Sequence, residues 1–126
     1  ITGCSSVLNY SSKKVNINEA DSKIQMWVKT IEPEDEKGIY LCKSTDDDGN
    51  DVYYAYFNGK DKENSYSYGS VNISPIKKEG IKIKFDTKKS KTGGEALFMI
   101  TVHDKKIQYI NLNGTIYIED KIYNVD

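Results

Sequence analysis

The feature that most constrains the fold is a repeated pattern of short apolar runs between residues 38 and 118. Each run is rich in β-branched and aromatic residues, and glycine, asparagine, aspartate or proline separates it from the next. Gly80 opens the clearest run, in which apolar and charged residues alternate from Ile81 to Asp86. Because successive side chains of a strand point to opposite faces, this alternation predicts a strand with Ile81, Ile83 and Phe85 buried.

The other runs have similar lengths and compositions. We expect further strands at residues 38–43, 51–58, 66–74, 96–102, 107–112 and 115–118. Seven or eight short strands with turn residues between them predict an all-β fold, as a single antiparallel β-sandwich or a small up-and-down barrel. Asn113-Gly114 suits a type I′ turn, because both central residues of that turn take a positive φ. We therefore expect the last three runs to form a three-strand meander.

Residues 23–31 fit two structures. Ile24, Trp27 and Val28 recur at helical spacing, and Asn18 could cap such a helix. The same run is rich in β-branched and aromatic residues, and Ile24, Met26 and Val28 alternate with polar ones. We favour a strand because the chain that follows is consistently β. The alternative is an α+β fold with one N-terminal helix around residues 19–31.

Length and charge limit the class of protein. A chain of 126 residues suggests one domain with enough length to bury a core. Eighteen basic residues, all lysine, nearly balance nineteen acidic ones, so the formal net charge is −1. A nucleic-acid-binding domain would carry a marked positive excess. We therefore predict no nucleic-acid partner.

The chain begins Ile1-Thr2-Gly3-Cys4, an aliphatic residue, a small residue, glycine and cysteine. This stretch resembles the lipobox of bacterial lipoproteins, and the resemblance covers only residues 1–6. It implies a lipid on Cys4, which would anchor the chain to the extracytoplasmic face of the cell membrane. Residues 1–4 would then end the signal, 5–22 would be a polar tether, and 23–126 would form the domain. The abundance of residues with A/T-rich codons favours a Gram-positive source.

The second cysteine, Cys42, leaves alternatives open. If Cys4 carries lipid, we expect Cys42 to be a small buried hydrophobic residue. A Cys4–Cys42 disulfide closing a long loop is the first alternative, and two unrelated free thiols are the second.

Residues 46–51 resemble a calcium-binding loop in part. Asp46, Asp48 and Asn50 stand at alternate positions, as ligands of an EF-hand do. The glycine expected sixth is Asp51 and the glutamate expected twelfth is Phe57. We therefore favour a hairpin turn with solvated carboxylates, and predict no metal site beyond these weak candidates.

No residues stand out as catalytic. His103 is the only histidine, and its neighbour Asp104 is expected on the same tight turn, where the two would not orient one another. We therefore predict a protein that is not an enzyme and that needs no cofactor.

The ten tyrosines are the one compositional feature that suggests recognition. Tyrosine offers a large contact area at low entropic cost, together with a hydroxyl for polar partners. Tyr54 and Tyr56 share a face of one expected strand, and Tyr66 and Tyr68 share a face of the next. Our leading hypothesis is a non-catalytic, surface-anchored domain that binds a protein or a glycan through these tyrosines. A β-barrel carrier of an apolar ligand is the alternative, and a carboxylate-based hydrolase is less favoured.

Overall fold

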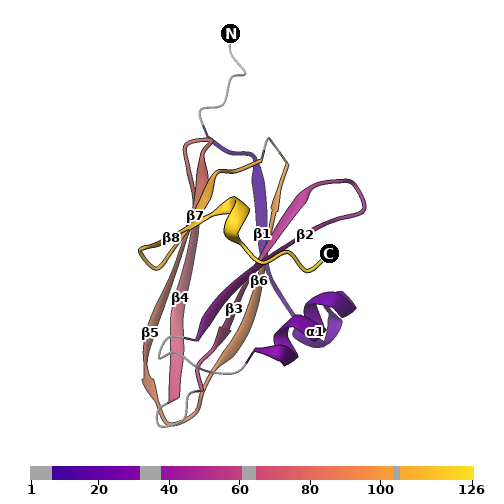
Figure 1. Ribbon diagram of the computed structural model, residues 1–126. Helices are drawn as coiled ribbons and strands as arrows, with labels where there is room; N and C mark the ends of the chain where they lie inside the picture. Colours follow the sequence, from indigo (N-terminus) through magenta and orange to yellow (C-terminus); the bar gives the residue numbers. More distant parts are fainter. Residues whose placement is uncertain (1–6, 32–37, 61–64, 104–105) are drawn as a thin grey trace.

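The computed structural model describes residues 7–31, 38–60, 65–103 and 106–126, and it shows two four-stranded sheets packed face to face (Figure 1). The elements are β1 (Tyr10–Val15), η1 (Ile17–Glu19), α1 (Ser22–Thr30), β2 (Ile39–Thr45), β3 (Asp51–Asn58), β4 (Ser65–Ile76), β5 (Gly80–Ser90), β6 (Glu95–Val102), β7 (Tyr109–Leu112), β8 (Thr115–Ile118) and η2 (Glu119–Lys121). The predicted all-β sandwich is confirmed.

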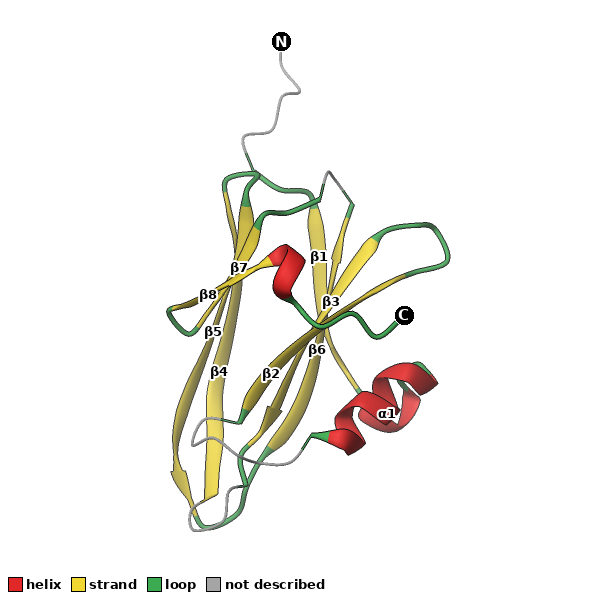
Figure 2. Ribbon diagram, viewed as in Figure 1, coloured by secondary structure: helices red, strands yellow, loops and turns green. Residues whose placement is uncertain are grey.

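Each sheet has its own pairing pattern. The first, sheet A, has the strand order β1-β6-β3-β2, and all of its pairs are antiparallel. The second, sheet B, has the order β4-β5-β7-β8, and β5 and β7 run parallel. Figure 2 shows the two sheets as separate layers with α1 beside sheet A. The described strands therefore form a sandwich and not the alternative barrel.

The main core lies between the two sheets. The alternation predicted for β5 is confirmed, since Ile81, Ile83 and Phe85 are at most 2% exposed. The ring of Phe85 stacks on Phe57 with centroids 5.8 Å apart, and it contacts Phe98 edge-on at 5.6 Å. Aromatic side chains from both sheets thus interlock at the centre of the sandwich.

A second apolar layer covers the outer face of sheet A. Strand β3 is buried on both faces, because Tyr53, Ala55 and Phe57 enter the main core while Tyr54 and Tyr56 lie under α1. A strand covered on both sides needs apolar residues at every position, and the sequence of β3 meets that need.

The strand favoured for residues 23–31 is wrong, and the alternative helix is correct. The side chain of Asp21 caps α1 by accepting a hydrogen bond from the backbone N–H of Lys23 at 3.2 Å. Ile24, Trp27 and Val28 face sheet A, whereas Met26 is 67% exposed. The apolar residues at helical spacing therefore form one buried face. A strand would have buried Met26 together with Ile24 and Val28, and Met26 is exposed.

The prediction of a tether over residues 5–22 is wrong from Leu8 onward. Leu8 is 4% exposed and packs in the main core, and β1 pairs with β6 along its whole length. The sequence of β1 is polar because it forms an edge of sheet A, where most of its side chains remain exposed.

The predicted three-strand meander is also wrong, although its final hairpin is correct. Asn113 and Gly114 have φ values of 50° and 88°, as a type I′ turn requires. Strand β6, however, belongs to sheet A between β1 and β3, and the chain then crosses to sheet B. Both faces of β6 are apolar, which suits the centre of a covered sheet better than a strand in an open meander.

Replacement of Phe85 by alanine should lower the free energy of unfolding by about 3 to 5 kcal/mol, because it empties the centre of the aromatic cluster. Urea denaturation followed by tryptophan fluorescence would measure the change. Lys84→Ala is the matched control on the exposed face of β5, and its effect should stay within about 0.5 kcal/mol. Similar losses in the two variants would contradict this assignment of the core.

Candidate functional site

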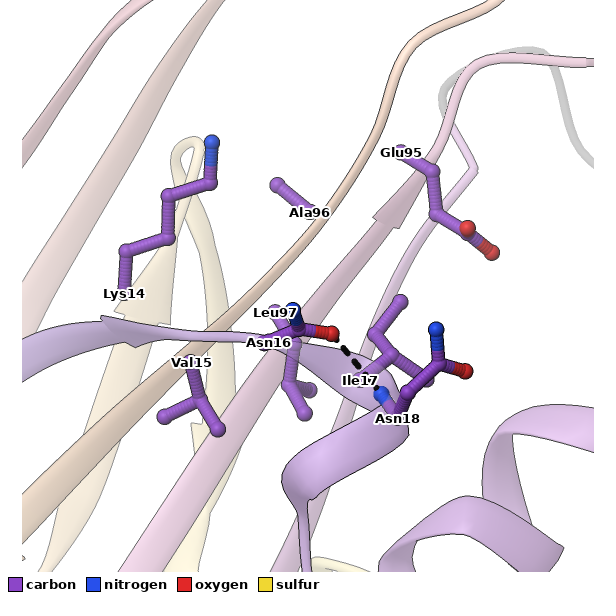
Figure 3. Close-up of a pocket in the computed structure, with 8 residues that line it drawn as sticks. All are labelled: Lys14, Val15, Asn16, Ile17, Asn18, Glu95, Ala96 and Leu97. Atoms are coloured by element: carbon purple, nitrogen blue, oxygen red, sulfur yellow. Dashed lines mark hydrogen bonds between the residues drawn. The ribbon is translucent and has the colours of Figure 1, made fainter.

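A groove of about 470 Å³ lies where β1 leaves sheet A and β6 enters it (Figure 3). Its lining residues come from two segments, residues 14–18 and residues 95–97. Figure 3 shows the Lys14 side chain at one end of the lining residues and the Glu95 side chain at the other, with Leu97 between them. The two charged side chains lie on opposite faces of sheet A, because Lys14 contacts Tyr68 of the main core while Glu95 is bound by Tyr56 beneath α1.

The chain after β1 is held in a fixed shape by short-range hydrogen bonds. The side chain of Asn16 accepts a hydrogen bond from the backbone N–H of Asn18 at 3.0 Å, which caps η1. Gln25 of α1 donates to the carbonyls of Asn18 and Ala20 at 3.3 and 2.7 Å. The carboxamide of Asn18 makes no side-chain hydrogen bond to any other described residue, so both of its polar atoms are available to a ligand.

The two charged groups of the groove are also positioned by aromatic residues. The Glu95 carboxylate accepts a hydrogen bond from the Tyr56 hydroxyl, and burial together with this bond raises the pKa of Tyr56. The ammonium of Lys14 lies 5.7 Å from the centre of the Tyr68 ring, within cation–π range. The groove thus offers a fixed carboxylate and a free amide, groups that bind hydroxyls and backbone amides.

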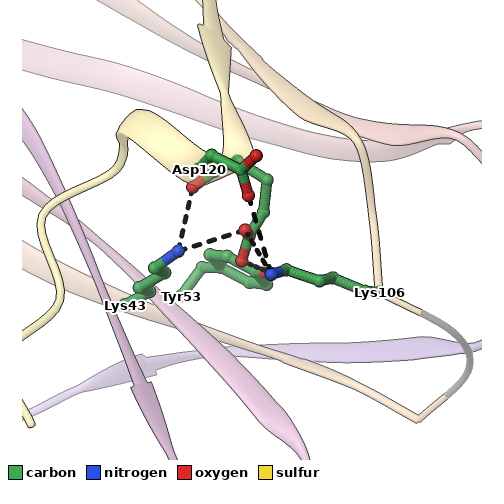
Figure 4. Close-up of polar contacts among 5 residues, drawn as sticks. Lys43, Tyr53, Lys106 and Asp120 are labelled. Atoms are coloured by element: carbon green, nitrogen blue, oxygen red, sulfur yellow. Dashed lines mark hydrogen bonds and ion pairs between the residues drawn. The ribbon is translucent and has the colours of Figure 1, made fainter.

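A separate charged cluster lies at the opposite edge of the sandwich (Figure 4). The side chain of Glu119 is only 4% exposed, and one of its oxygens lies 3.1 Å from the ammonium groups of both Lys43 and Lys106. Its other oxygen accepts a hydrogen bond from the Tyr53 hydroxyl at 2.9 Å. These residues come from β2, β3, η2 and the chain before β7, so the cluster joins sheet A to sheet B.

The ionisation of Glu119 follows from its partners. Burial alone would raise the pKa of this carboxyl, but hydrogen bonds from Lys43, Tyr53 and Lys106 outweigh burial and hold the pKa below its usual value. Burial and the bond to Glu119 raise the pKa of Tyr53. The carboxylate thus has three described partners, two ammonium groups and one hydroxyl. This arrangement is typical of a structural ion pair.

The structure does not bring the four predicted tyrosines together. Tyr54 and Tyr56 are 8% and 2% exposed and lie beneath α1. Tyr66 and Tyr68 are half-buried and pack against the core on the other side of sheet A. The four side chains therefore form no common binding face. Tyr56 and Tyr68 are connected to the groove only through their contacts with Glu95 and Lys14, respectively, which are two of its lining residues.

The acidic turn between β2 and β3 is folded by its own hydrogen bonds. One carboxylate oxygen of Asp46 accepts from the backbone N–H groups of Asp48 and Asn50 at 3.0 and 2.8 Å. These bonds, with that to Asn50 first, lower the pKa of Asp46. The favoured interpretation, a hairpin turn, is confirmed, and the described residues contain no group of three or more His, Cys, Asp or Glu side chains placed to hold a metal ion.

The remaining candidates are placed as follows. His103 is exposed and lies 3.2 Å from the Ser11 hydroxyl, while Asp104 lies outside the described residues. Cys42 is a fully buried free thiol, as expected for a small hydrophobic residue, and burial raises its pKa. Cys4 also lies outside the described residues, so its lipidation stays a prediction.

No protein-family model, no curated protein and no solved structure matches the chain. Neither α1 nor any other described helix is long and apolar enough to span a membrane.

Few features of the sequence could have predicted the groove. Its lining residues belong to the predicted tether and to the start of the strand predicted at residues 96–102, with Glu95 just before that strand. The N-x-N-E sequence at residues 16–19 is a capping signal that could have indicated a fixed turn. Nothing in the sequence places that turn beside Glu95.

Replacement of Glu119 by glutamine should lower the free energy of unfolding by about 3 kcal/mol at neutral pH, because it leaves the half-buried Lys43 without its counter-charge. The folded pKa of Glu119 lies below its unfolded value, so this contribution is complete above the unfolded pKa and is lost as the pH falls through the folded one. Urea denaturation of both proteins between pH 7 and pH 2 would show the difference shrinking in acid.

The matched control is Asp120→Asn, because the Asp120 side chain is 81% exposed and lies 3.7 Å from the same Lys106. We expect it to change stability by less than about 0.5 kcal/mol. A difference between wild type and Glu119→Gln that stayed constant down to pH 2 would show that the carboxylate charge is not what stabilises the fold.

Proposed function

We propose that this chain is a non-catalytic binding domain, anchored to the extracytoplasmic face of a membrane by lipid on Cys4. Its groove between β1 and β6 binds a polar segment of a protein or glycan partner. The observation that carries the proposal is the groove itself, where the free amide of Asn18 and the fixed carboxylate of Glu95 border an apolar floor. Sites for small polar ligands combine these features.

The groups around the groove favour binding over hydrolysis. A carboxylate-based hydrolase of glycans needs two acidic side chains on either side of the scissile bond. Glu95 is the one acidic residue among the described residues that line the groove. This arrangement favours binding and leaves general acid–base catalysis without its second group.

The sandwich offers less support for the apolar carrier. That hypothesis depends on a closed barrel with a hollow interior. The interior between the described sheets is instead filled by aromatic and aliphatic side chains such as Phe57, Phe85 and Ile110, each at most 2% exposed.

The position of Leu8 fits an anchored binding domain. Leu8 is fixed to the end of the sandwich by its backbone N–H, which donates to the carbonyl of Lys77 at 2.8 Å. Four residues of chain span at most about 14 Å, so a lipid on Cys4 would hold this end close to the membrane. The groove lies at the other end of β1, beyond Val15, and would face away from the membrane toward a partner.

Replacement of Cys4 by serine in the complete precursor, expressed in its native host, should move the protein from the membrane fraction to the soluble one. Loss of the thiol removes the atom that carries the lipid, and metabolic labelling with a radioactive fatty acid would follow it directly. Cys42→Ser is the matched control, because Cys42 is buried and its loss should leave both the label and the location unchanged. An unmodified Cys4 in a soluble native protein would refute the anchor.

A photoreactive diazirine amino acid in place of Asn18 should capture the partner on intact cells. The same substitution at Asn72, an exposed position paired with Lys84 on sheet B, is the control and should capture nothing in common with it. Digestion of the product with protease or with glycosidases then tells a protein from a glycan. Equal capture at the two positions would refute a site in the groove.

Glu95→Gln should weaken binding of the captured partner about tenfold, since it removes the charge from a hydrogen-bond acceptor and preserves its shape. Isothermal titration with the purified partner would measure the loss. Asp86→Asn, an exposed acidic residue of β5 that accepts a hydrogen bond from Ser70, is the control and should bind as the wild type does.

A further inference from the structure

Strand β8 is an exposed edge without the usual protection. Its four residues, Thr115 to Ile118, are all exposed and include no charge, proline or glycine. Ile116 and Ile118 are 50% and 51% exposed, and Tyr117 is 37% exposed. Figure 2 shows the β7–β8 hairpin at the margin of the molecule. An uncharged edge rich in β-branched residues is a template for pairing with another strand.

The other three sheet edges are protected. The C-terminal segment covers β2, because Lys43 donates to the carbonyl of Tyr123 at 2.8 Å and accepts from the N–H of Val125 at 3.0 Å. Strand β4 has a register shift between Tyr68 and Ser70, and β1 carries a pair of exposed lysines at its centre. Bulges, lysines and covering segments are the ways in which proteins block edge pairing. Among the described edges, β8 alone lacks them.

The β7–β8 pairing fixes which backbone groups are free. The two-residue turn makes Leu112 and Thr115 a hydrogen-bonded pair, and such pairs recur at every second residue. Glu119 fits the same alternation of hydrogen-bonded pairs, since its N–H donates to the carbonyl of Gln108 at 2.9 Å. The N–H and C=O groups of Ile116 and Ile118 therefore point away from β7, toward the open edge.

We propose that β8 pairs with β8 of a second copy of this chain, antiparallel and about a two-fold axis at Tyr117. Ile116 then lies opposite Ile118 of the second copy, and the reverse, so the free groups of these residues form four hydrogen bonds. All four isoleucines meet on the outer face of sheet B, since Ile110 and Leu112 mark the inner face. Sheet B of one copy and sheet B of the other then form one continuous sheet of eight strands.

The sequence of β8 is what selects a second copy as the occupant. With a two-fold axis perpendicular to the sheet, the outer faces of both copies must lie on the same side. This requires each odd-numbered residue to lie opposite an odd-numbered one, and each even-numbered residue opposite an even-numbered one. The register centred on Tyr117 pairs isoleucine with isoleucine on both sides, whereas the register centred on Ile116 places Ile118 against Gly114. With no charge in either strand, the copies meet without repulsion.

The size of the contact predicts a weak dimer. Two four-residue edges bury less than the roughly 1,000 Å² of a stable interface, so we expect a dissociation constant on the order of 0.1 mM or above. This pairing uses an edge remote from the groove, and it stands or falls independently of the proposed function.

The register is tested by disulfide trapping in the full chain with Cys4 replaced by serine. Tyr117→Cys places two thiols in a directly opposed pair without hydrogen bonds, with Cα atoms about 4.5 Å apart, within the range for a disulfide. Ile116→Cys is the matched control, because its copies would lie two residues out of step and about 8 Å apart, beyond that range. Cys42 is fully buried and should not react.

At about 0.5 mM protein, mild oxidation should convert Tyr117→Cys to dimer at least about tenfold faster than Ile116→Cys, as disulfide geometry requires. Sedimentation of the unmodified chain should show a dimer that grows with concentration, and Ile116→Lys should abolish it with an unchanged circular dichroism spectrum. Equal trapping of the two cysteine variants would overturn the register. A chain that stays monomeric at millimolar concentration would overturn the pairing, and a foreign strand would then be the occupant of this edge.

Discussion

The structure depends on the burial of β3 on both of its faces. Tyr53, Ala55 and Phe57 complete the core between the sheets, and Tyr54 and Tyr56 hold α1 against sheet A. Loss of either layer would expose a row of aromatic and aliphatic side chains to water, and burial of such surface is the main favourable term in folding. The helix is therefore part of the domain, and its position fixes the turn that forms the groove, through the bonds from Gln25.

Polar contacts supply the geometry that apolar burial leaves open. The Glu119 cluster joins β2 and β3 of sheet A to the chain around β7 and β8 of sheet B, and the C-terminal segment that follows η2 covers the edge of β2. A buried carboxylate with three partners is costly if any partner is lost, so it favours one relative placement of the sheets. This segment pairs with β2 and not with β8, so the edge of β8 stays open to a second strand.

The groove and the β8 edge lie on different parts of the sandwich and would act separately. The groove joins segments 14–18 and 95–97, while β8 lies at the far edge of sheet B. A domain held near a membrane at its Leu8 end would keep the groove accessible, because the groove is at the opposite end of β1. Pairing through β8 would place two grooves in one assembly without covering either.

The sequence by itself determined the class of fold and most strand positions. The alternation around Ile83, the β2–β3 hairpin and the Asn113-Gly114 turn are local patterns, and local patterns decide which face of a strand is apolar and where the chain turns. The tertiary structure alone decided which strands become neighbours, because β6 and β7 are adjacent in sequence but enter different sheets. It also decided that residues 22–30 form a helix, since the apolar face of Ile24 and Trp27 is stable only where sheet A covers it. The groove, too, was decided by the tertiary structure. Asn18 and Glu95 are 77 positions apart, and only the pairing of β1 with β6 brings their segments together.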